Sequence, residues 1–230
     1  QNQKKVKEKK TILDSSPRVI LVQNIGVFCV GDSLKAAKVA LDLTETNARV
    51  ISSVEETSKY KFISKKDIFD VEYWSLEQAK IKKEKKELAG NIVVITGAFG
   101  GIGTATYKLF KKYGAEVILI DNDKQKVSEM SKKLNELCIY CDVTNKESVK
   151  KAFNLISSQF GGLDILISNA GTAMGGSIAE VEDKILRKSF EDNFFSHQNC
   201  ASEATKIMKY QNIEGCLLFN ISKQSVNPGK

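Results

Sequence analysis

Residues 92–103 read Ile-Val-Val-Ile-Thr-Gly-Ala-Phe-Gly-Gly-Ile-Gly, an apolar run that ends in a glycine-rich turn. The continuous apolar run predicts a β-strand buried on both faces. After it, Gly97, Gly101 and Gly103 allow a sharp turn and leave the backbone open to a ligand, because they lack a Cβ. The helix expected next presents free N–H groups and its positive dipole end to an anion. The stretch therefore predicts the phosphate-binding turn of a dinucleotide-binding βαβ unit, with a purely structural turn as the minor alternative.

Apolar strands alternate with helical patterns on the C-terminal side of this turn. The expected strands are 92–95, 116–121, 137–141, 163–168 and 216–221, and the expected helices are 103–113, 123–135, 145–159 and 183–209. Such alternation is typical of a parallel sheet covered by helices on both faces. We therefore expect an α/β fold with a Rossmann-type doubly wound parallel sheet, incomplete at the C-terminus.

Asp121 stands at the end of the second expected strand, 18 residues after Gly103. A carboxylate at this point can accept hydrogen bonds from both ribose hydroxyls of a dinucleotide and repels a 2′-phosphate. Position 100 is Gly rather than Arg or Lys, so both features favour NAD over NADP, although Lys124 is a cation close downstream. The alternative for Asp121 is a helix N-cap.

The first 88 residues follow another pattern. Residues 18–30 predict two short strands around a turn at 24–26, and residues 34–43 predict an amphipathic helix. A Lys/Glu-rich helical run over 75–87 is a candidate interdomain connector. We expect two domains, 1–88 and 89–230.

Composition excludes several classes of protein. The net charge is +7, but the Lys residues are interspersed with Glu and Asp, which indicates a solvated surface rather than a nucleic-acid or membrane partner. No apolar stretch approaches the roughly 18 residues of a transmembrane helix, and no apolar segment follows the Lys-rich start as in a signal peptide. Because no Met stands at position 1, the sequence looks cut at its start.

The five Cys residues are odd in number and irregularly spaced, which favours reduced thiols and a cytoplasmic location. Cys138-x-x-Cys141 lies in a strand-like run, so we expect core cysteines rather than a redox pair. The single His, His197, excludes a multi-His metal site within the chain, and we expect it to be packed rather than catalytic.

Four motifs occur in the order and spacing of the short-chain dehydrogenase/reductase family: Thr96-Gly-x-x-x-Gly-Ile-Gly103, Cys141-Asp142-Val143, Asn169-Ala170-Gly171 and Asn220-Ile221-Ser222. Residues 90–230 thus resemble that family. The resemblance implies an NAD site made of Gly97, Phe99, Gly100, Gly101, Ile102, Gly103, Asp121, Asp142, Val143, Asn169, Ala170 and Gly171. It implies that Asp142 and Val143 contact adenine and that the Asn169–Gly171 turn closes over the cofactor.

The same resemblance implies two catalytic residues. Asn193 would hold a proton-relay water, and Ser222 would hydrogen-bond the reacting carbonyl or hydroxyl, although the family usually places this Ser where the chain has Lys223. The family's Tyr-x-x-x-Lys motif, the general acid/base, is expected after Ser222 and is not reached before Lys230. We therefore expect this chain to be an inactive, truncated fragment of an active parent. The helix over 183–209 is the one through which the family commonly forms homo-oligomers.

Residues 19–31 and the Ala-rich helix after them are similar to the end of a class II sugar-phosphate aldolase domain, without His to hold its metal. The join between the two parts resembles the bifunctional rhamnulose-1-phosphate aldolase/alcohol dehydrogenase proteins. The predicted function is hydride transfer between NAD and a hydroxyl or carbonyl carbon of a small sugar-derived substrate such as lactaldehyde. The alternatives are a non-catalytic dinucleotide-binding module, or a protein whose role is defined by the aldolase half.

Overall fold

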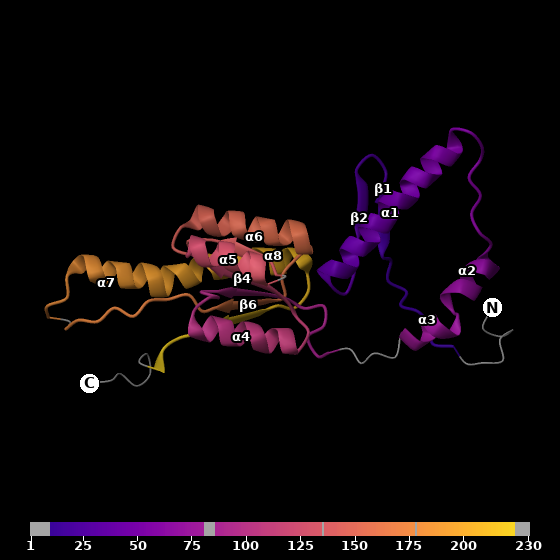
Figure 1. Ribbon diagram of the computed structural model, residues 1–230. Helices are drawn as coiled ribbons and strands as arrows, with labels where there is room; N and C mark the ends of the chain where they lie inside the picture. The colour runs from indigo at the N-terminus through magenta and orange to yellow at the C-terminus, as the bar shows by residue number, and fades with distance from the viewer. Residues whose placement is uncertain (1–9, 81–85, 135, 178, 224–230) are drawn as a thin grey trace. The chain divides into compact units, whose positions relative to one another are not determined.

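The computed structural model describes residues 10–80, 86–134, 136–177 and 179–223. The chain divides into two compact units, 1–86 and 87–230 (Figure 1). Each unit is described by itself.

The first unit contains a hairpin and three helices. Strands β1 (Val19–Val22) and β2 (Gly26–Cys29) pair antiparallel around a turn in which Asn24 has φ +61°. Helix α1 (Leu34–Glu55) is capped by Ser33, whose hydroxyl accepts a hydrogen bond from the Ala36 N–H at 3.1 Å. The prediction ended this helix at residue 43, and this was wrong because residues 44–55 contain neither Gly nor Pro to stop it.

Helices α2 (Lys65–Glu72) and α3 (Ser75–Lys80) complete the first unit. The predicted helical run over 75–87 is present as α3, while its residues 81–85 lie outside the described residues and Glu87 begins a turn. None of the described residues of α1 or α2 is buried.

The second unit is a five-stranded parallel sheet with helices on both faces, as the sequence predicts. The strands are β3 (Ile92–Thr96), β4 (Glu116–Asp121), β5 (Cys138–Tyr140), β6 (Ile165–Ser168) and β7 (Cys216–Phe219), in the order β5-β4-β3-β6-β7. The chain builds outward from β3 to β5, then returns to place β6 on the other side of β3. Ligands of such folds bind at this topological switch, outside the carboxyl ends of the strands.

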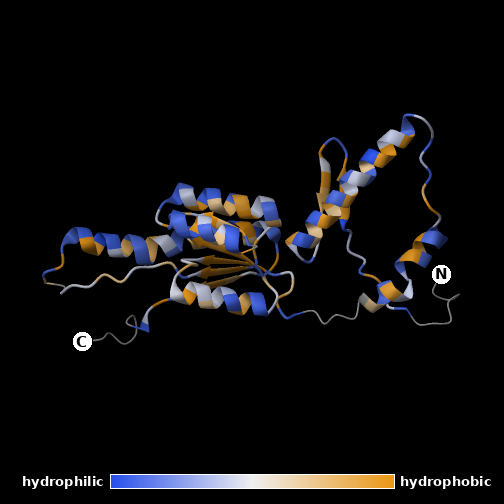
Figure 2. Cartoon of the chain, in the orientation of Figure 1, coloured by the Kyte–Doolittle hydropathy of each residue, from blue (hydrophilic) through white to orange (hydrophobic). Residues whose placement is uncertain are grey.

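Alternate residues of each central strand face opposite helical layers, since side chains alternate along a strand. Val94, Ile118 and Leu166 are fully buried against α6 (Lys146–Phe160) and α8 (Ser196–Gln211). Val93, Ile95 and Val117 face the layer of α4 (Gly101–Lys112). Figure 1 shows α4 on the opposite face of the sheet from α6 and α8, and Figure 2 shows the apolar strands between them. Helix α5 (Lys124–Lys133) packs beside β4 and β5.

The long helix predicted over 183–209 has an internal irregularity. It comprises α7 (Asp183–Phe190), a π-helical turn η2 (Glu191–Phe195) and α8, and it ends at Asn212, which has φ +54°. The π turn lies at Asn193, and such turns are frequent at functional sites.

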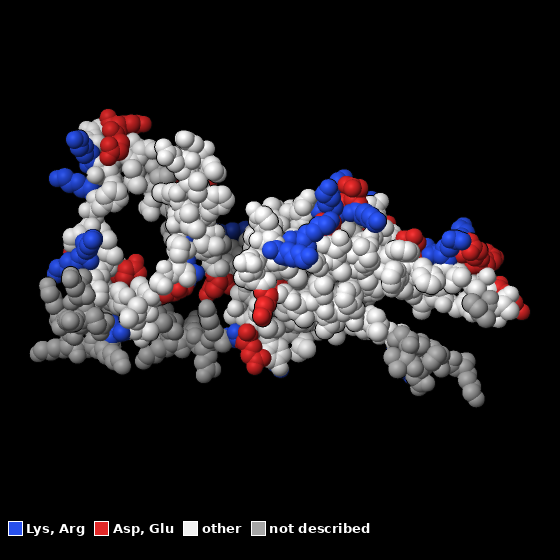
Figure 3. Space-filling view, turned by 180° about the vertical axis from the view of Figure 1, so that it is seen from behind, with Lys and Arg blue, Asp and Glu red and all other residues white. Residues whose placement is uncertain are grey.

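The surface carries charges of both signs. On the face seen in Figure 3, basic and acidic side chains are interspersed over the second unit. Within the described segments, no helix is long and apolar enough to cross a membrane.

Candidate functional site

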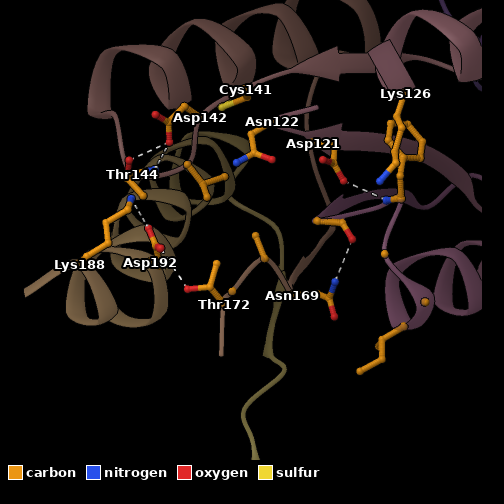
Figure 4. A pocket seen from close by; sticks show the side chains of 18 residues that line it. Asp121, Asn122, Lys126, Cys141, Asp142, Thr144, Asn169, Thr172, Lys188 and Asp192 are labelled. Carbon is orange, nitrogen blue, oxygen red and sulfur yellow. Dashed lines mark hydrogen bonds and ion pairs between the residues drawn. The ribbon is translucent and has the colours of Figure 1, made fainter. Parts of the chain in front are cut away.

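A cavity of about 620 Å³ lies at the switch point, outside the carboxyl ends of the central strands (Figure 4). Its walls come from the glycine turn, from the ends of β4, β5 and β6, and from the long helix. Of the twelve predicted cofactor residues, all except Gly103 line it. The predicted catalytic residues Asn193 and Ser222 are not among the lining residues.

The glycines of the turn have different roles. Gly97 has φ +61°, and a Cβ there would lie 2.9 Å from the Ala170 Cα, so the turn and the 169–171 segment meet only because Gly97 has no side chain. At Gly103 a Cβ would lie 2.3 Å from the Gly97 carbonyl oxygen, which explains why this residue packs helix against strand instead of lining the cavity. At Gly101 no atom lies within 4 Å of the Cβ position, so the backbone is open on that side.

The Asp121 carboxylate is held at the cavity wall by two backbone donors. Its Oδ2 accepts from the Phe99 N–H at 3.0 Å, and its Oδ1 accepts from the Asp123 N–H at 3.2 Å. The N-cap of α5 is Asp123, which accepts from the N–H groups of Gln125 and Lys126, so the alternative of Asp121 as a cap is wrong. Asp121 instead ties the glycine turn to β4.

Asn169 joins the ends of three neighbouring strands. Its Nδ2 donates to the carbonyl oxygens of Thr96 at 3.0 Å and Gly97 at 3.1 Å. Its Oδ1 accepts from Asn220 Nδ2 at 2.8 Å, and the Thr96 hydroxyl accepts from the N–H groups of Asn169 and Ala170. This network fixes the floor of the cavity across β3, β6 and β7.

The loop after β5 is fixed by side chains on both sides. Asp142 Oδ1 accepts from the N–H (3.0 Å) and hydroxyl (2.7 Å) of Thr144. The buried Asn199 donates to the Val143 carbonyl oxygen at 3.1 Å, while its own Oδ1 is buried without a partner among the described residues. These contacts place Asp142, Val143 and Thr144 on the cavity wall.

Seven lining residues are absent from the sequence prediction: Asn122, Lys126, Cys141, Thr144, Thr172, Lys188 and Asp192. Lys188 Nζ and Asp192 Oδ1 are 2.6 Å apart, and the Thr172 hydroxyl donates to Asp192 Oδ2 at 3.0 Å. The hydrogen bond from Lys188 to Asp192 raises the pKa of Lys188, and the charges of Asp192 and Asp142 add to this. No motif marks these three residues, and only their spacing of four on a helix could have paired Lys188 with Asp192.

The predicted catalytic residues have other surroundings. Asn193 Oδ1 accepts from the Thr172 N–H at 2.9 Å, so this side chain supports the segment after Gly171. Ser222 follows β7 and is exposed. Both assignments remain predictions.

A Tyr-x-x-x-Lys spacing does occur on α4, at Tyr107 and Lys111, but away from the cavity. Lys111 Nζ pairs with Glu136 at 2.8 Å, and Tyr107 packs against the apolar cluster on that face of the sheet. Burial raises the pKa of Tyr107, whereas a general acid/base needs a pKa closer to neutrality. This pair is therefore structural.

His197 and the three cysteines Cys138, Cys141 and Cys200 lie in packed surroundings. The buried Ser168 hydroxyl and His197 Nδ1 are 2.6 Å apart, the imidazole ring contacts Phe219 edge-on, and burial lowers the pKa of His197. Burial raises the pKa of the Cys138 and Cys141 thiols, and that of Cys200 to about 12. Raised values are those of unreactive thiols rather than of a redox pair.

The cavity fits a dinucleotide. Its volume is within the roughly 300–1,000 Å³ of small-molecule sites. The N-terminus of α4 and the open backbone at Gly101 suit a pyrophosphate, and a pre-oriented carboxylate at the end of the second strand suits a ribose. Fold and site thus define a Rossmann-type dinucleotide-binding domain.

Comparison with known proteins gives the family. The short chain dehydrogenase model matches residues 91–230, and the chain belongs to that family. Residues 1–81 match the model for the second domain of class II aldolases.

Relatives and solved structures agree with this. The uncharacterized oxidoreductase YuxG of Bacillus subtilis is 31% identical over 95% of this chain and 33% of its own length. Short chain aldehyde dehydrogenase 1 of Euphorbia lathyris is 34% identical over 61% of this chain and 50% of its own. The chain thus spans half or less of these curated relatives. The 3-ketoacyl-(acyl-carrier-protein) reductase from Brucella melitensis, solved with NADH, has a TM-score of 0.57 and 25% identity over 61% of this chain and 60% of its own.

Proposed function

We propose that this protein is the dinucleotide-binding part of an NAD-linked oxidoreductase. The observation that carries the proposal is Asp121, whose carboxylate is oriented at the cavity wall by the Phe99 and Asp123 N–H groups. An anion in this place accepts ribose hydroxyls and repels a 2′-phosphate. A solved relative at 25% identity holds NADH, which supports a nicotinamide dinucleotide here as well.

The nearby cations support the same cofactor preference. Lys124 was the cation that could favour NADP, but its Nζ lies 4.8 Å from the centre of the Tyr140 ring. Lys126 lines the cavity, and its Nζ is 3.5 Å from Asp123 Oδ2, so a carboxylate already partly balances its charge. With Asp121 added, the ribose end of the cavity has more negative than positive groups, which disfavours a phosphate.

The first test is a fluorescence titration of the 230-residue chain with NADH and NADPH. We expect NADH to bind at least about tenfold more tightly, equivalent to about 1.4 kcal/mol. Asp121→Asn keeps an acceptor for the Phe99 N–H and removes the charge, so it should reduce the preference for NADH. Absence of NADH binding by the unsubstituted chain would refute the proposal.

For the reaction, NAD supplies the hydride acceptor when bound. The turn at Gly97–Gly103 and Asp121 would hold and orient it, Ser222 would hydrogen-bond the substrate oxygen, and Asn193 would hold a relay water. The substrate class that we propose is a small sugar-derived hydroxyl or carbonyl compound such as lactaldehyde. Reading the codons downstream of Lys230 separates this function from a non-catalytic binding module, since only the enzyme needs a Tyr with a Lys four residues later.

We further propose a two-part cytoplasmic protein with an aldolase-like half before the dehydrogenase half. The support is the match of residues 1–81 to an aldolase model and a relative, YuxG, that aligns with 95% of the chain. A homo-oligomer that forms through the long helix would cover Phe190 and Phe194. These side chains lie four residues apart, on one side of the helix, and are 54% and 58% exposed. The upstream sequence tests the aldolase half through the presence or absence of paired His ligands.

A further inference from the structure

Two ion pairs lie next to each other on the long helix but have different surroundings. Arg187 Nε is 2.6 Å from Asp183 Oδ2, and both side chains are more than 70% exposed. Lys188 Nζ is 2.6 Å from Asp192 Oδ1, and the Asp192 side chain is only 10% exposed. Only the second pair lines the cavity.

Burying a carboxylate is costly unless partners replace its water. Asp192 has two such partners, the Lys188 ammonium on one oxygen and the Thr172 hydroxyl on the other. An exposed ion pair such as Arg187–Asp183 contributes little to helix stability and needs no buried carboxylate. Helix stability alone therefore does not explain why Asp192 is buried. Asp192, with Thr172 on its second oxygen, thus holds the Lys188 ammonium at the cavity wall, and we call these three residues the clamp.

The clamp lies at the end of the cavity that is lined by the loop after β5. Figure 4 shows Lys188 beside Thr144, with Asp142 adjacent on the loop after β5. The Asp142 charge acts on Lys188, and the loop itself is fixed by Thr144 and Asn199. Asp142 and Val143 are the residues for which the family resemblance implies contact with adenine. An ammonium, which only donates, thus lies beside a carboxylate, which only accepts. Adenosine offers groups for both, namely ring nitrogens and hydroxyls as acceptors, and amino and hydroxyl groups as donors.

We propose that Lys188 is a binding residue for the adenosine half of the cofactor, with Asp192 and Thr172 as the residues that position it. The assignment rests on the proposed function, because it requires a dinucleotide in the cavity. It adds a contact from the long helix to a site otherwise built from strand ends and turns.

The test compares Lys188→Met with Arg187→Met. Both variants remove one positive charge from adjacent positions of one helix, so the long-range attraction of an anionic ligand changes equally in both. The probes are NADH, ADP-ribose and reduced nicotinamide mononucleotide, measured by fluorescence and by competition. We expect Lys188→Met to weaken NADH and ADP-ribose binding by about tenfold, since a charge-assisted hydrogen bond is lost. Reduced nicotinamide mononucleotide should change by less than about twofold, and Arg187→Met should change none of the three by more than that.

A second variant protects the test against a folding defect. Lys188→Met leaves the buried Asp192 with one partner fewer, whereas Lys188→Met/Asp192→Asn removes the buried charge as well. The double variant should show the same selective loss of ADP-ribose affinity. Asp192→Asn alone, which keeps the Lys188 charge but weakens the clamp, should lose about threefold for ADP-ribose and nothing for the mononucleotide.

The outcomes separate this assignment from the proposed function. Equal losses for Lys188→Met and Arg187→Met, equal losses for ADP-ribose and the mononucleotide, or no loss at all would each overturn the assignment while the unsubstituted chain still binds NADH. If the unsubstituted chain binds none of the three probes, the proposed function fails as well.

Discussion

Replacing Gly103 by Ala should destabilise the dinucleotide-binding unit, although it adds one methyl group to a helix. The new Cβ would lie 2.3 Å from the Gly97 carbonyl oxygen and 2.8 Å from the Ala98 Cα. Real Cβ atoms keep at least 3.0 Å from such atoms, so the turn and the helix must separate by 0.7 Å or more. Both neighbours are backbone, and a rotamer change cannot relieve the contact.

The size of the effect follows from two opposing terms. Overpacking costs about 1–3 kcal/mol, and a clash with backbone belongs at the upper end of this range. Ala gains about 1 kcal/mol over Gly in helix propensity. The net loss is about 2 kcal/mol, which lowers the Tm of a unit of this size by about 4–8 °C.

Gly101→Ala is the matched control, two residues earlier in the same turn. No atom lies within 4 Å of its Cβ position, so its Tm should stay within about 2 °C of that of the unsubstituted chain. Its methyl group faces the open backbone of the cavity, and NADH affinity should fall at least about tenfold. Thermal unfolding by circular dichroism and NADH fluorescence measure the two effects. A Gly103→Ala chain with an unchanged Tm, or a Gly101→Ala chain that loses stability equally, would refute the division of roles between the glycines.

Three further outcomes are expected. Asn169→Asp removes the donor to the Thr96 and Gly97 carbonyls and should lower the free energy of unfolding in urea by about 2–3 kcal/mol. An unchanged midpoint would contradict the role of Asn169 in joining the strand ends. A thiol reagent at pH 8 should react in the native chain with the exposed Cys216 but not with Cys200, whose pKa is raised to about 12, so Cys216→Ser slows native labelling and Cys200→Ser does not. Burial lowers the pKa of His197 in the folded chain, so as the pH falls below the ordinary value of 6.5 the unfolded chain binds the proton first and stability decreases. His197→Gln should therefore reduce the change in Tm between pH 7.5 and 5.5. Equal changes in Tm for the variant and the unsubstituted chain would disprove this.

The sheet and the glycine turn could be predicted because their signals are local. An apolar run such as 92–96 marks a buried strand by itself, and the spacing from Gly103 to Asp121 is set by one helix and one strand. Eleven of the twelve predicted cofactor residues line the cavity for the same reason, since each stands at a strand end, in a turn or at the start of α4.

The helical contributions to the site could not be predicted in this way. Lys188 and Asp192 lie about seventy residues from Asp121, and only the folded sheet brings the long helix to the cavity. Lys124, the cation that could favour NADP, does not line the cavity, and the reason is geometric. Successive helical residues turn by about 100°, so Lys124 and Lys126 point to nearly opposite sides, one over Tyr140 and the other into the cavity.

The motifs of this chain mark the site because they build it. Both carboxylate oxygens of Asp121 accept hydrogen bonds from backbone N–H groups. The Asn169 amide donates to the Thr96 and Gly97 carbonyls and accepts from Asn220. These bonds hold β4, β3, β6 and β7 in one arrangement, so the wall that meets a ligand at the turn is largely backbone. The Asp121 carboxylate, to which the proposed function attributes the preference for NAD, is the exception, and further side chains that line the cavity come from elements outside the motifs. The long helix supplies one in Lys188, so affinity for the adenosine half of the ligand should depend on a residue that no motif contains as well as on the motif residues.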